Sequence, residues 1–178
     1  MPNWSKTEIR ISAKKEILDE LMKSVVVTQD YLDKIKKTNA NLSDEFKTHP
    51  KKLGEVDFNI LIPKPHYVFN NKSDGENNWY DWNCENWGTK WNACDDEVER
   101  LSDEDVIISF HTAWCYPLNW LYTLADKAKE VGVKYVRGVS TYAYDPAIYY
   151  KFKLNLTSGK IQFREKHDAE LEEFLKSK

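Results

Sequence analysis

The chain has 178 residues, of which 41% are hydrophobic, 13% aromatic and 31% charged, and its formal net charge is −3. A chain of this length and apolar content can fold around one core without disulfides or a structural metal, and its acidic balance excludes a general basic surface for non-specific nucleic-acid binding. It contains no apolar run near the roughly 20 residues of a membrane span, and its first residues lack the layout of a signal peptide.

The first half of the chain predicts two strands separated by two helices. Glu8–Ser12 alternates polar and apolar residues, which is the period of a half-buried strand. Ser12 could cap a helix whose apolar stripe runs from Ile17 to Val25, and a second helical pattern follows at Tyr31–Ile35. Val56–Ile62 is the second predicted strand. The polar stretch before it predicts a loop with room for a short helix at Leu42–Phe46.

The second half predicts two strands on either side of a helix, then a hairpin and a terminal helix. Nearly continuous apolar residues at Val106–Trp114 favour a central strand. Pro117 and Gly132 suit the first and last turns of the helix that follows. A short Gly-containing turn joins the two hairpin strands. The remaining ranges are Leu118–Val131 for the helix, Lys134–Val139 for the fourth strand, Ile148–Leu156 and Lys160–Arg164 for the hairpin, and His167–Leu175 for the terminal helix.

The order of these elements predicts an α+β fold of the ferredoxin-like, split β-α-β type. Two β-α-β units build an antiparallel sheet with both helices on one face, which leaves the other face or an edge for recognition. We expect a single domain over residues 1–178, because no repeat or flexible linker divides the chain. A Trp-rich insert occupies residues 78–93, and a hairpin and helix extend the domain over residues 147–178.

The segment Asn78–Ala93 holds four of the seven tryptophans in the chain. Trp79 and Trp82 are three residues apart, the spacing of neighbours on one helical face, and Trp87 and Trp91, four apart, could share a face in the same way. Because tryptophan is usually highly buried, one interpretation is that these rings extend the core at the open end of the sheet. The other is an aromatic cradle for a base, a sugar or a partner's side chain, with polar side chains at its rim.

Charge is spread unevenly along the chain. Glu76–Asp105 holds ten acidic residues against two basic ones, and Lys134–Lys166 holds seven basic residues against two acidic ones. The simplest interpretation is two solvated faces of opposite sign. The basic stretch could also supply a modest phosphate-binding patch.

The cysteines do not predict a metal site. Cys84, Cys94 and Cys115, together with His111, could in principle supply four zinc ligands, but no two cysteines lie at the close Cys-x-x-Cys spacing. An odd number of cysteines at irregular spacing indicates free thiols in a reducing cytosol instead.

The sequence gives little support to an enzyme. It contains no nucleophile elbow and no glycine-rich phosphate loop. The remaining enzymatic interpretation uses Asp81 and Glu85, four residues apart, as an acid/base pair together with His111. It requires all three groups within hydrogen-bond reach of one another.

Three blocks of the sequence carry a resemblance to a known family. They are Met1–Trp4 before a strand that ends at Ser12–Ala13, the Trp82-x4-Trp87–Ala93 block, and Phe110-x-Thr112–Trp114 followed by Pro117. In this order they are similar to the YubB-type ferredoxin-like proteins, small proteins of plasmids, phages and prophages without an established biochemical function. The similarity covers Met1 to Tyr135.

The resemblance implies a ferredoxin-like fold, an origin in a mobile element and a place in the bacterial cytoplasm, and it supplies no catalytic residues. One segment departs from the family pattern. Its members usually have an acidic, Gly-containing segment in and after the fourth strand, whereas this chain has Arg137–Tyr144, which includes Tyr142. This segment is therefore a candidate for a function specific to this protein.

We expect a non-enzymatic binding protein from a phage or other mobile element, which inhibits a host defence or another host factor by binding a host protein or complex. The alternative is a nucleotide or single-stranded nucleic-acid binder that stacks bases on the Trp-rich segment. Neither function requires a cofactor or a metal. The candidate binding residues are Trp79, Asp81, Trp82, Asn83, Glu85, Trp87, Lys90, Trp91, Arg137, Tyr142 and Tyr144.

Overall fold

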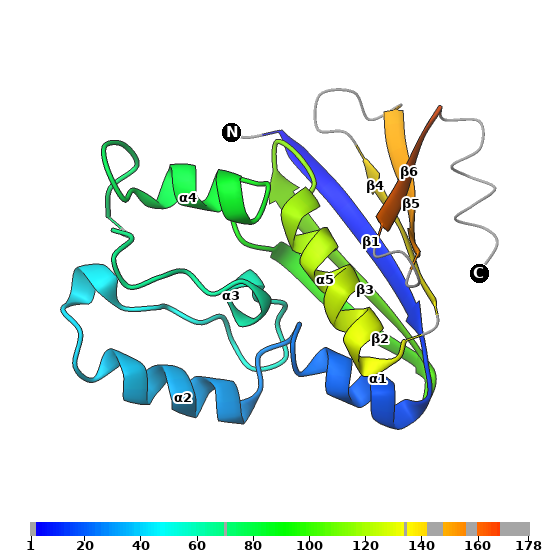
Figure 1. The fold of residues 1–178 in the computed structure, drawn as a ribbon, viewed down its shortest axis with the longest axis horizontal. Coiled ribbons are helices and arrows are strands. Elements are labelled where there is room, and N and C mark those ends of the chain that lie inside the picture. The colour runs from blue at the N-terminus through cyan, green and yellow to red at the C-terminus, as the bar shows by residue number, and fades with distance from the viewer. Residues whose placement is uncertain (1–2, 70, 134, 142–147, 156–159, 168–178) are drawn as a thin grey trace.

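A six-stranded sheet organises the protein, in the order β2-β3-β1-β4-β5-β6 (Figure 1). The computed structural model of the chain describes residues 3–69, 71–133, 135–141, 148–155 and 160–167. All neighbouring strands in the sheet are antiparallel. The strands are β1 (Trp4–Ser12), β2 (Cys94–Ser102), β3 (Asp105–Ala113), β4 (Tyr135–Thr141), β5 (Ile148–Asn155) and β6 (Lys160–His167).

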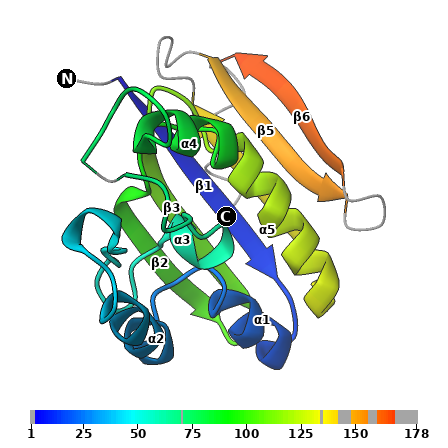
Figure 2. The same ribbon diagram turned by 60° about the vertical axis from the view of Figure 1, so that its left-hand side comes forward.

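The first four strands and two helices form a ferredoxin-like unit. Helix α1 (Lys15–Met22) follows β1, and helix α5 (Leu118–Val131) connects β3 to β4. Both helices pack on the same face of the sheet, as Figures 1 and 2 show. The strand order β2-β3-β1-β4 with these two connections is the split β-α-β arrangement. The predicted α+β, ferredoxin-like class is therefore confirmed.

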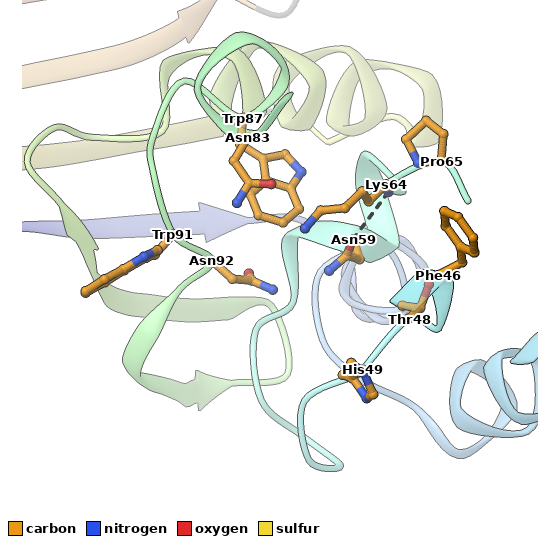
Figure 3. A pocket seen from close by; sticks show the side chains of 10 residues that line it. All are labelled: Phe46, Thr48, His49, Asn59, Lys64, Pro65, Asn83, Trp87, Trp91 and Asn92. Atoms are coloured by element: carbon orange, nitrogen blue, oxygen red, sulfur yellow. Dashed lines mark hydrogen bonds between the residues drawn. The ribbon is translucent and has the colours of Figure 1, made fainter. Parts of the chain in front are cut away.

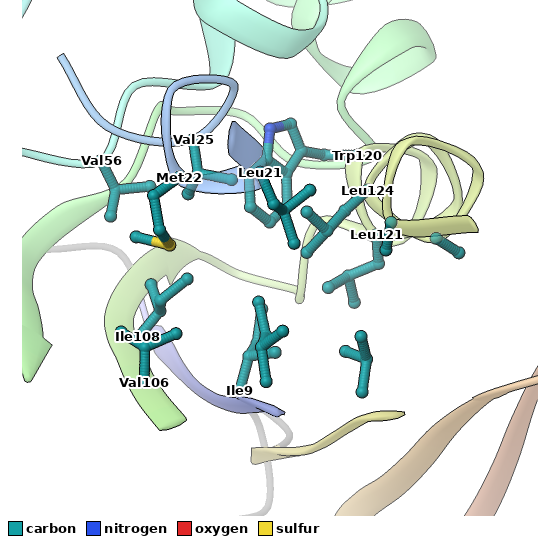
Figure 4. Packing of buried hydrophobic residues seen from close by; sticks show 14 of the residues in the cluster. Ile9, Leu21, Met22, Val25, Val56, Val106, Ile108, Trp120, Leu121 and Leu124 are labelled. Atoms are coloured by element: carbon teal, nitrogen blue, oxygen red, sulfur yellow. The ribbon is translucent and has the colours of Figure 1, made fainter. Parts of the chain in front are cut away.

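The core lies between this face of the sheet and the two helices (Figure 4). Ile9 of β1 and Ile108 of β3 are cross-strand partners, and both are fully buried. They pack against Leu21 of α1 and against Trp120 and Leu124 of α5. Burying one such side chain stabilises a fold by about 1.5–3 kcal/mol, so these contacts fix the helices against the sheet.

Helix α5 begins and ends where the sequence predicts. Pro117 precedes its first residue, and Gly132 follows its last residue in the left-handed conformation, with φ of 86°. The N–H of Gly132 and that of Val133 bond to carbonyl groups of the last turn. Glycine adopts this conformation without a steric cost, which is why it ends helices so often.

The second predicted strand, Val56–Ile62, is wrong. Only Val56 takes part in strand pairing, through an isolated bridge, and Phe58–Leu61 forms the short helix α3. The buried side chain of Asp57 accepts a hydrogen bond from the N–H of Asn59 (2.9 Å) and so caps this helix. An aspartate at the N-cap favours a helix start, and here it outweighs the alternating pattern.

The second strand is instead β2, in a segment where the sequence predicts no strand. It lies at one edge of the sheet and pairs with β3. Val98 packs against the core, whereas Glu97 and Glu99 on either side of it are exposed. Acidic side chains on an edge strand discourage pairing with another chain. They also interrupt the apolar alternation by which a strand is predicted from sequence.

A long insert between α1 and β2 adds several short elements beside the sheet (Figure 2). Helix α2 (Gln29–Asn39) confirms the second helical pattern, and a 3₁₀ turn at Asp44–Phe46 confirms the short helix predicted there. Helix α4 (Trp79–Asn86) follows α3. Among the helices of the described residues, none has the length and apolarity that a membrane crossing requires.

The predicted cap of the first helix is wrong. Helix α1 begins at Lys15 with Lys14 at the N-cap position and without a capping side chain. The hydroxyl of Ser12 donates to Asp105 across the sheet instead (2.5 Å). Because Ser12 is still part of β1, the helix starts two residues later than its sequence signal suggests.

The predicted hairpin is confirmed as β5 and β6, which extend the sheet beyond β4. Strand β6 reaches His167, so this residue does not begin a helix. The rest of the predicted terminal helix, residues 168–175, lies outside the described residues.

Candidate functional site

The Trp-rich segment is a short helix followed by a turn and a loop. Asn78 caps α4, because its Oδ1 accepts a hydrogen bond from the N–H of Asp81 (2.8 Å). Gly88 then has φ of 82°, and a Cβ on it would lie 2.8 Å from the backbone nitrogen of Leu118. The chain therefore turns sharply here, and Trp87 and Trp91 do not share a helical face as predicted.

The four tryptophans of the segment divide into one core residue and three half-buried ones. Trp87 is 1% exposed, and its Nε1 donates to the carbonyl of Ile62 (3.0 Å). Trp79, Trp82 and Trp91 are partly exposed. The core interpretation is therefore confirmed for Trp87, and the aromatic-cradle interpretation stays a prediction for the three half-buried rings.

Lys90 lies among three aromatic rings at the end of the sheet. Its Nζ is 4.6 Å from the ring centroid of Trp114, 5.3 Å from that of Trp91 and 5.5 Å from that of Tyr80. Trp91 in turn contacts Trp4, which is 40% exposed. Cation–π contacts of this kind stabilise the arrangement of the rings, so Lys90 links three aromatic side chains at this end of the sheet.

An acidic groove of about 320 Å³ runs along α4. Three carboxylates border it, those of Glu76, Asp81 and Glu85, and all three residues are exposed. Two aromatic rings complete its walls, the half-buried Trp82 and Tyr67, which is 61% exposed. The groove thus brings together three of the predicted site residues: Asp81, Trp82 and Glu85.

A second cavity, which we call the indole pocket, lies beneath the Trp-rich segment (Figure 3). It has a volume of about 230 Å³ and brings together three further predicted residues, Asn83, Trp87 and Trp91. Lys64 and Asn59 also line the pocket, and no sequence pattern singled them out. Lys64 lies with its Nζ 5.4 Å from the ring centroid of Trp87.

The structure does not bring Arg137 to the Trp-rich segment. Arg137 of β4 is the cross-strand partner of Arg10, whereas Trp4, beside Trp91, lies six residues away at the other end of β1. A strand rises by about 3.3 Å per residue, which separates the two ends by about 20 Å. Arg137 and Lys90 therefore do not bind the same phosphate group. Tyr142 and Tyr144 lie outside the described residues.

The structure does not bring Asp81, Glu85 and His111 together, as the enzymatic interpretation requires. Asp81 and Glu85 face the acidic groove, whereas His111 lies on β3 with its ring 6.4 Å from that of Trp4 and does not line that groove. An acid/base triad requires these groups within hydrogen-bond reach. The residues do not form it.

The three cysteines are separate thiols. Within the described part of the chain, no group of three or more His, Cys, Asp or Glu side chains is arranged to hold a metal ion. Burial raises the pKa of Cys84, Cys94 and Cys115. The thiols are therefore protonated at neutral pH, the form that reacts slowly.

We expect slow alkylation of all three cysteines by iodoacetamide at pH 7.5 in the folded protein. Their raised pKa values leave less thiolate than an unperturbed cysteine has, so the rate should rise steeply as pH increases towards 10. Mass spectrometry of timed samples measures this, with the urea-unfolded protein as the reference. Equal alkylation rates in the folded and unfolded states would contradict the conclusion that burial raises the pKa of these thiols.

Comparison with known proteins identifies a solved structure with a similar fold and gives no information on the candidate site. No family model and no curated protein matches the sequence. The structure is similar to the crystal structure of a protein named api92 from Yersinia pseudotuberculosis, described with the family model DUF1281. The similarity covers 94% of this chain and 99% of that chain, with a TM-score of 0.59 and 9% identity. At this identity it supports the shared fold alone, and the YubB-type resemblance stays a prediction.

Proposed function

We propose that the protein is a non-enzymatic binding protein from a phage or another mobile element, which inhibits a host factor by binding it. The observation that carries this proposal is the acidic groove along α4. It combines three exposed carboxylates with two aromatic rings in one concave surface. Aromatic residues are enriched among those that dominate the binding energy of protein interfaces, and complementary charge adds specificity.

The chemistry of the groove favours a basic side chain of the partner, above all arginine. A guanidinium group can stack on the rings of Tyr67 and Trp82 through cation–π contacts. At the same time its N–H groups can donate hydrogen bonds to the carboxylates around it. Glu85 is exposed and its side chain is available at the rim. Asp81 also accepts from the Nδ2 of Asn78 (2.7 Å), which holds its carboxylate at the groove. The expected partner thus presents a basic segment.

The origin in a mobile element and the inhibitory role rest on the sequence. The Trp-rich block and its two flanking blocks resemble YubB-type proteins of plasmids and phages. A small binding protein without catalytic groups acts on a host by occupying a surface of its target. The acidic groove is a suitable surface for this purpose because its charge speeds the encounter with a basic partner.

The double substitution Asp81→Asn with Glu85→Gln should weaken binding of the partner by at least about tenfold, because it removes two of the groove's charges. The experiment starts with affinity capture from host lysate and measures the affinity of the captured protein by biolayer interferometry. Binding should also weaken with rising salt.

The matched control is Asp126→Asn with Glu130→Gln, an exposed acidic pair with the same spacing on α5. It removes the same charge from a different surface and should leave the affinity unchanged within about twofold. Thermal melting checks that each variant folds. A partner that binds both variants and the wild type equally well would refute the groove as its docking site.

A further inference from the structure

The end of the sheet where β1 begins carries partly exposed aromatic rings around one lysine. We call this surface the aromatic band, and it consists of Trp4, Tyr80, Lys90, Trp91 and Trp114. Helix α4 and the start of β1 both lie at this end (Figures 1 and 2). The ring of Trp91 projects away from the indole pocket (Figure 3) and contacts that of Trp4, with 5.7 Å between centroids. The band is therefore a surface feature, separate from the cavity beneath it.

Trp4 offers the largest accessible surface in the aromatic band. Of the seven tryptophans, which all belong to the described residues, it is the one that is exposed, at 40%. Its ring meets that of Trp91 at an angle of 51° and that of His111 at 80°. Neither neighbour thus stacks in parallel on Trp4, and a flat aromatic ligand can stack on its indole.

Two lysines bring positive charge to this surface. The Nζ of Lys90 lies 4.6–5.5 Å from three ring centroids of the band. Lys6 is exposed, two residues after Trp4 on the same face of β1. Neither lysine forms a salt bridge with any residue that the structure describes. Their ammonium groups therefore keep N–H donors for an anionic ligand.

The backbone at Trp114 is strained, which indicates that this surface does more than complete the fold. Trp114 has φ of 72°, and the N–H of Cys115 donates to the carbonyl of Ala113 (3.0 Å). Together these features define a γ-turn of the rare, positive-φ form. A bulky residue seldom adopts a positive φ, and strain of this kind collects at functional sites.

Hydrogen bonds from two other segments hold this turn in place. The N–H of Trp114 donates to the carbonyl of Asn3 (2.8 Å), the residue before Trp4. The hydroxyl of Thr89, the residue before Lys90, donates to the carbonyl that closes the turn (3.1 Å). The three segments that carry the band are thus bonded to one another. A surface that is ordered before it binds loses less conformational entropy on binding.

We propose that the aromatic band binds single-stranded nucleic acid. A base stacks on the indole of Trp4, and the phosphates beside it accept hydrogen bonds from Lys6 and Lys90. Aromatic rings interleaved with basic side chains are the combination with which proteins bind single strands with little regard to sequence. The band shares no residue with the acidic groove, so this binding does not depend on the proposed function.

Fluorescence anisotropy of a short, labelled oligothymidylate tests the proposal on the unaltered protein. Binding should be saturable at low salt. The logarithm of the affinity should fall with the logarithm of the salt concentration at a slope of about −1.4, because each of two neutralised phosphates contributes about −0.7. A duplex of the same strand should bind at least about tenfold more weakly, since its bases stack on one another and do not reach Trp4.

Variants of the band separate stacking from charge. Trp4→Ala should weaken binding about 5- to 150-fold, which corresponds to ~1–3 kcal/mol for one stacked base, and should leave the salt slope unchanged. Lys90→Met should reduce the slope to about −0.7, because one phosphate contact is lost. Lys90→Arg keeps the charge and should keep the slope.

The matched control is Lys36→Met, which removes an exposed lysine of α2 outside the band. It should leave both the affinity and the slope unchanged within about twofold, because the site contains no contact with α2. The double substitution Asp81→Asn with Glu85→Gln, which tests the acidic groove, should not weaken binding of the oligonucleotide. The two surfaces can therefore be tested apart, and thermal melting checks that each variant folds.

Three results would overturn the proposal. The first is the absence of saturable binding up to about 1 mM protein at low salt. The second is equal affinity for the single strand and the duplex. The third is an equal loss in Lys36→Met and Lys90→Met, which would show that diffuse charge attracts the strand. The comparison of the two nucleic acids uses the wild-type protein, so it holds even if a variant fails to fold.

Discussion

Replacing Trp87 with alanine should destabilise the protein by about 3–5 kcal/mol, the range for removing a fully buried large aromatic side chain. Trp87 is 1% exposed and contacts the ring of Phe58 at 5.8 Å and that of Trp82 at 5.5 Å between centroids. The carbonyl of Ile62 also loses the Nε1–H of Trp87 as its hydrogen-bond donor. The substitution therefore leaves a cavity where the Trp-rich segment meets the core.

Urea denaturation followed by circular dichroism measures this loss as a lower midpoint. The matched control is Trp4→Ala, which removes the same side chain from a position that is 40% exposed. It should cost clearly less than Trp87→Ala, because a large part of the Trp4 surface is already in water. If the two variants were equally stable, Trp87 would not be a core residue, and the division of the tryptophans given above would be wrong.

Replacing Asp57 with alanine should cost about 3–5 kcal/mol, the range for breaking a buried charged hydrogen-bond network. Asp57 is fully buried, and its Oδ1 accepts from the N–H and Nδ2 of Asn59 and from Nδ2 of Asn92 (2.7–3.0 Å). Its Oδ2 accepts from the N–H of Lys51 (3.3 Å). Alanine would leave these donors buried without an acceptor.

The variant Asp57→Asn separates geometry from charge. Its Oδ1 can keep the three short hydrogen bonds, while its amide group faces the N–H of Lys51 and loses only the longest one. We therefore expect a loss of about 1–2 kcal/mol, smaller than that for alanine. The same denaturation experiment compares the two variants. Equal losses would show that the charge, and not the acceptor geometry, holds this network.

The outline of the fold could be predicted from the sequence because most of its elements carry local signals. Helix α5 is bounded by Pro117 and Gly132. Polar and apolar residues alternate in β1, and β3 begins with a nearly continuous apolar run. β2 has no such signal, because one apolar residue, Val98, packs against the core in an otherwise acidic strand. Val56–Ile62 carries a false signal, because the capping side chain of Asp57 starts a helix there.

The candidate site could be predicted only in part, for a similar reason. Aromatic density pointed to residues 78–93, and six of the predicted residues do line the acidic groove or the indole pocket. Lys64 could not be found, since it lies in an ordinary loop and lines the indole pocket through tertiary contacts alone. The buried Oδ1 of Asn83, which has no hydrogen-bond partner among the described residues, is likewise recognisable only once its surroundings are known.

The central position of β1 also governs the order in which the protein can fold as it is made. β1 is the first strand to be synthesised, yet Thr7 pairs with Phe110 about 100 residues later and bonds to Ser140, 133 residues away. At roughly 5–20 residues per second, the strand waits roughly 5–20 s before β3 exists. During that time its apolar residues have no sheet to join, so they are exposed unless local structure such as α1 covers them. Assembly of the sheet is therefore a late event, and aggregation is the competing outcome.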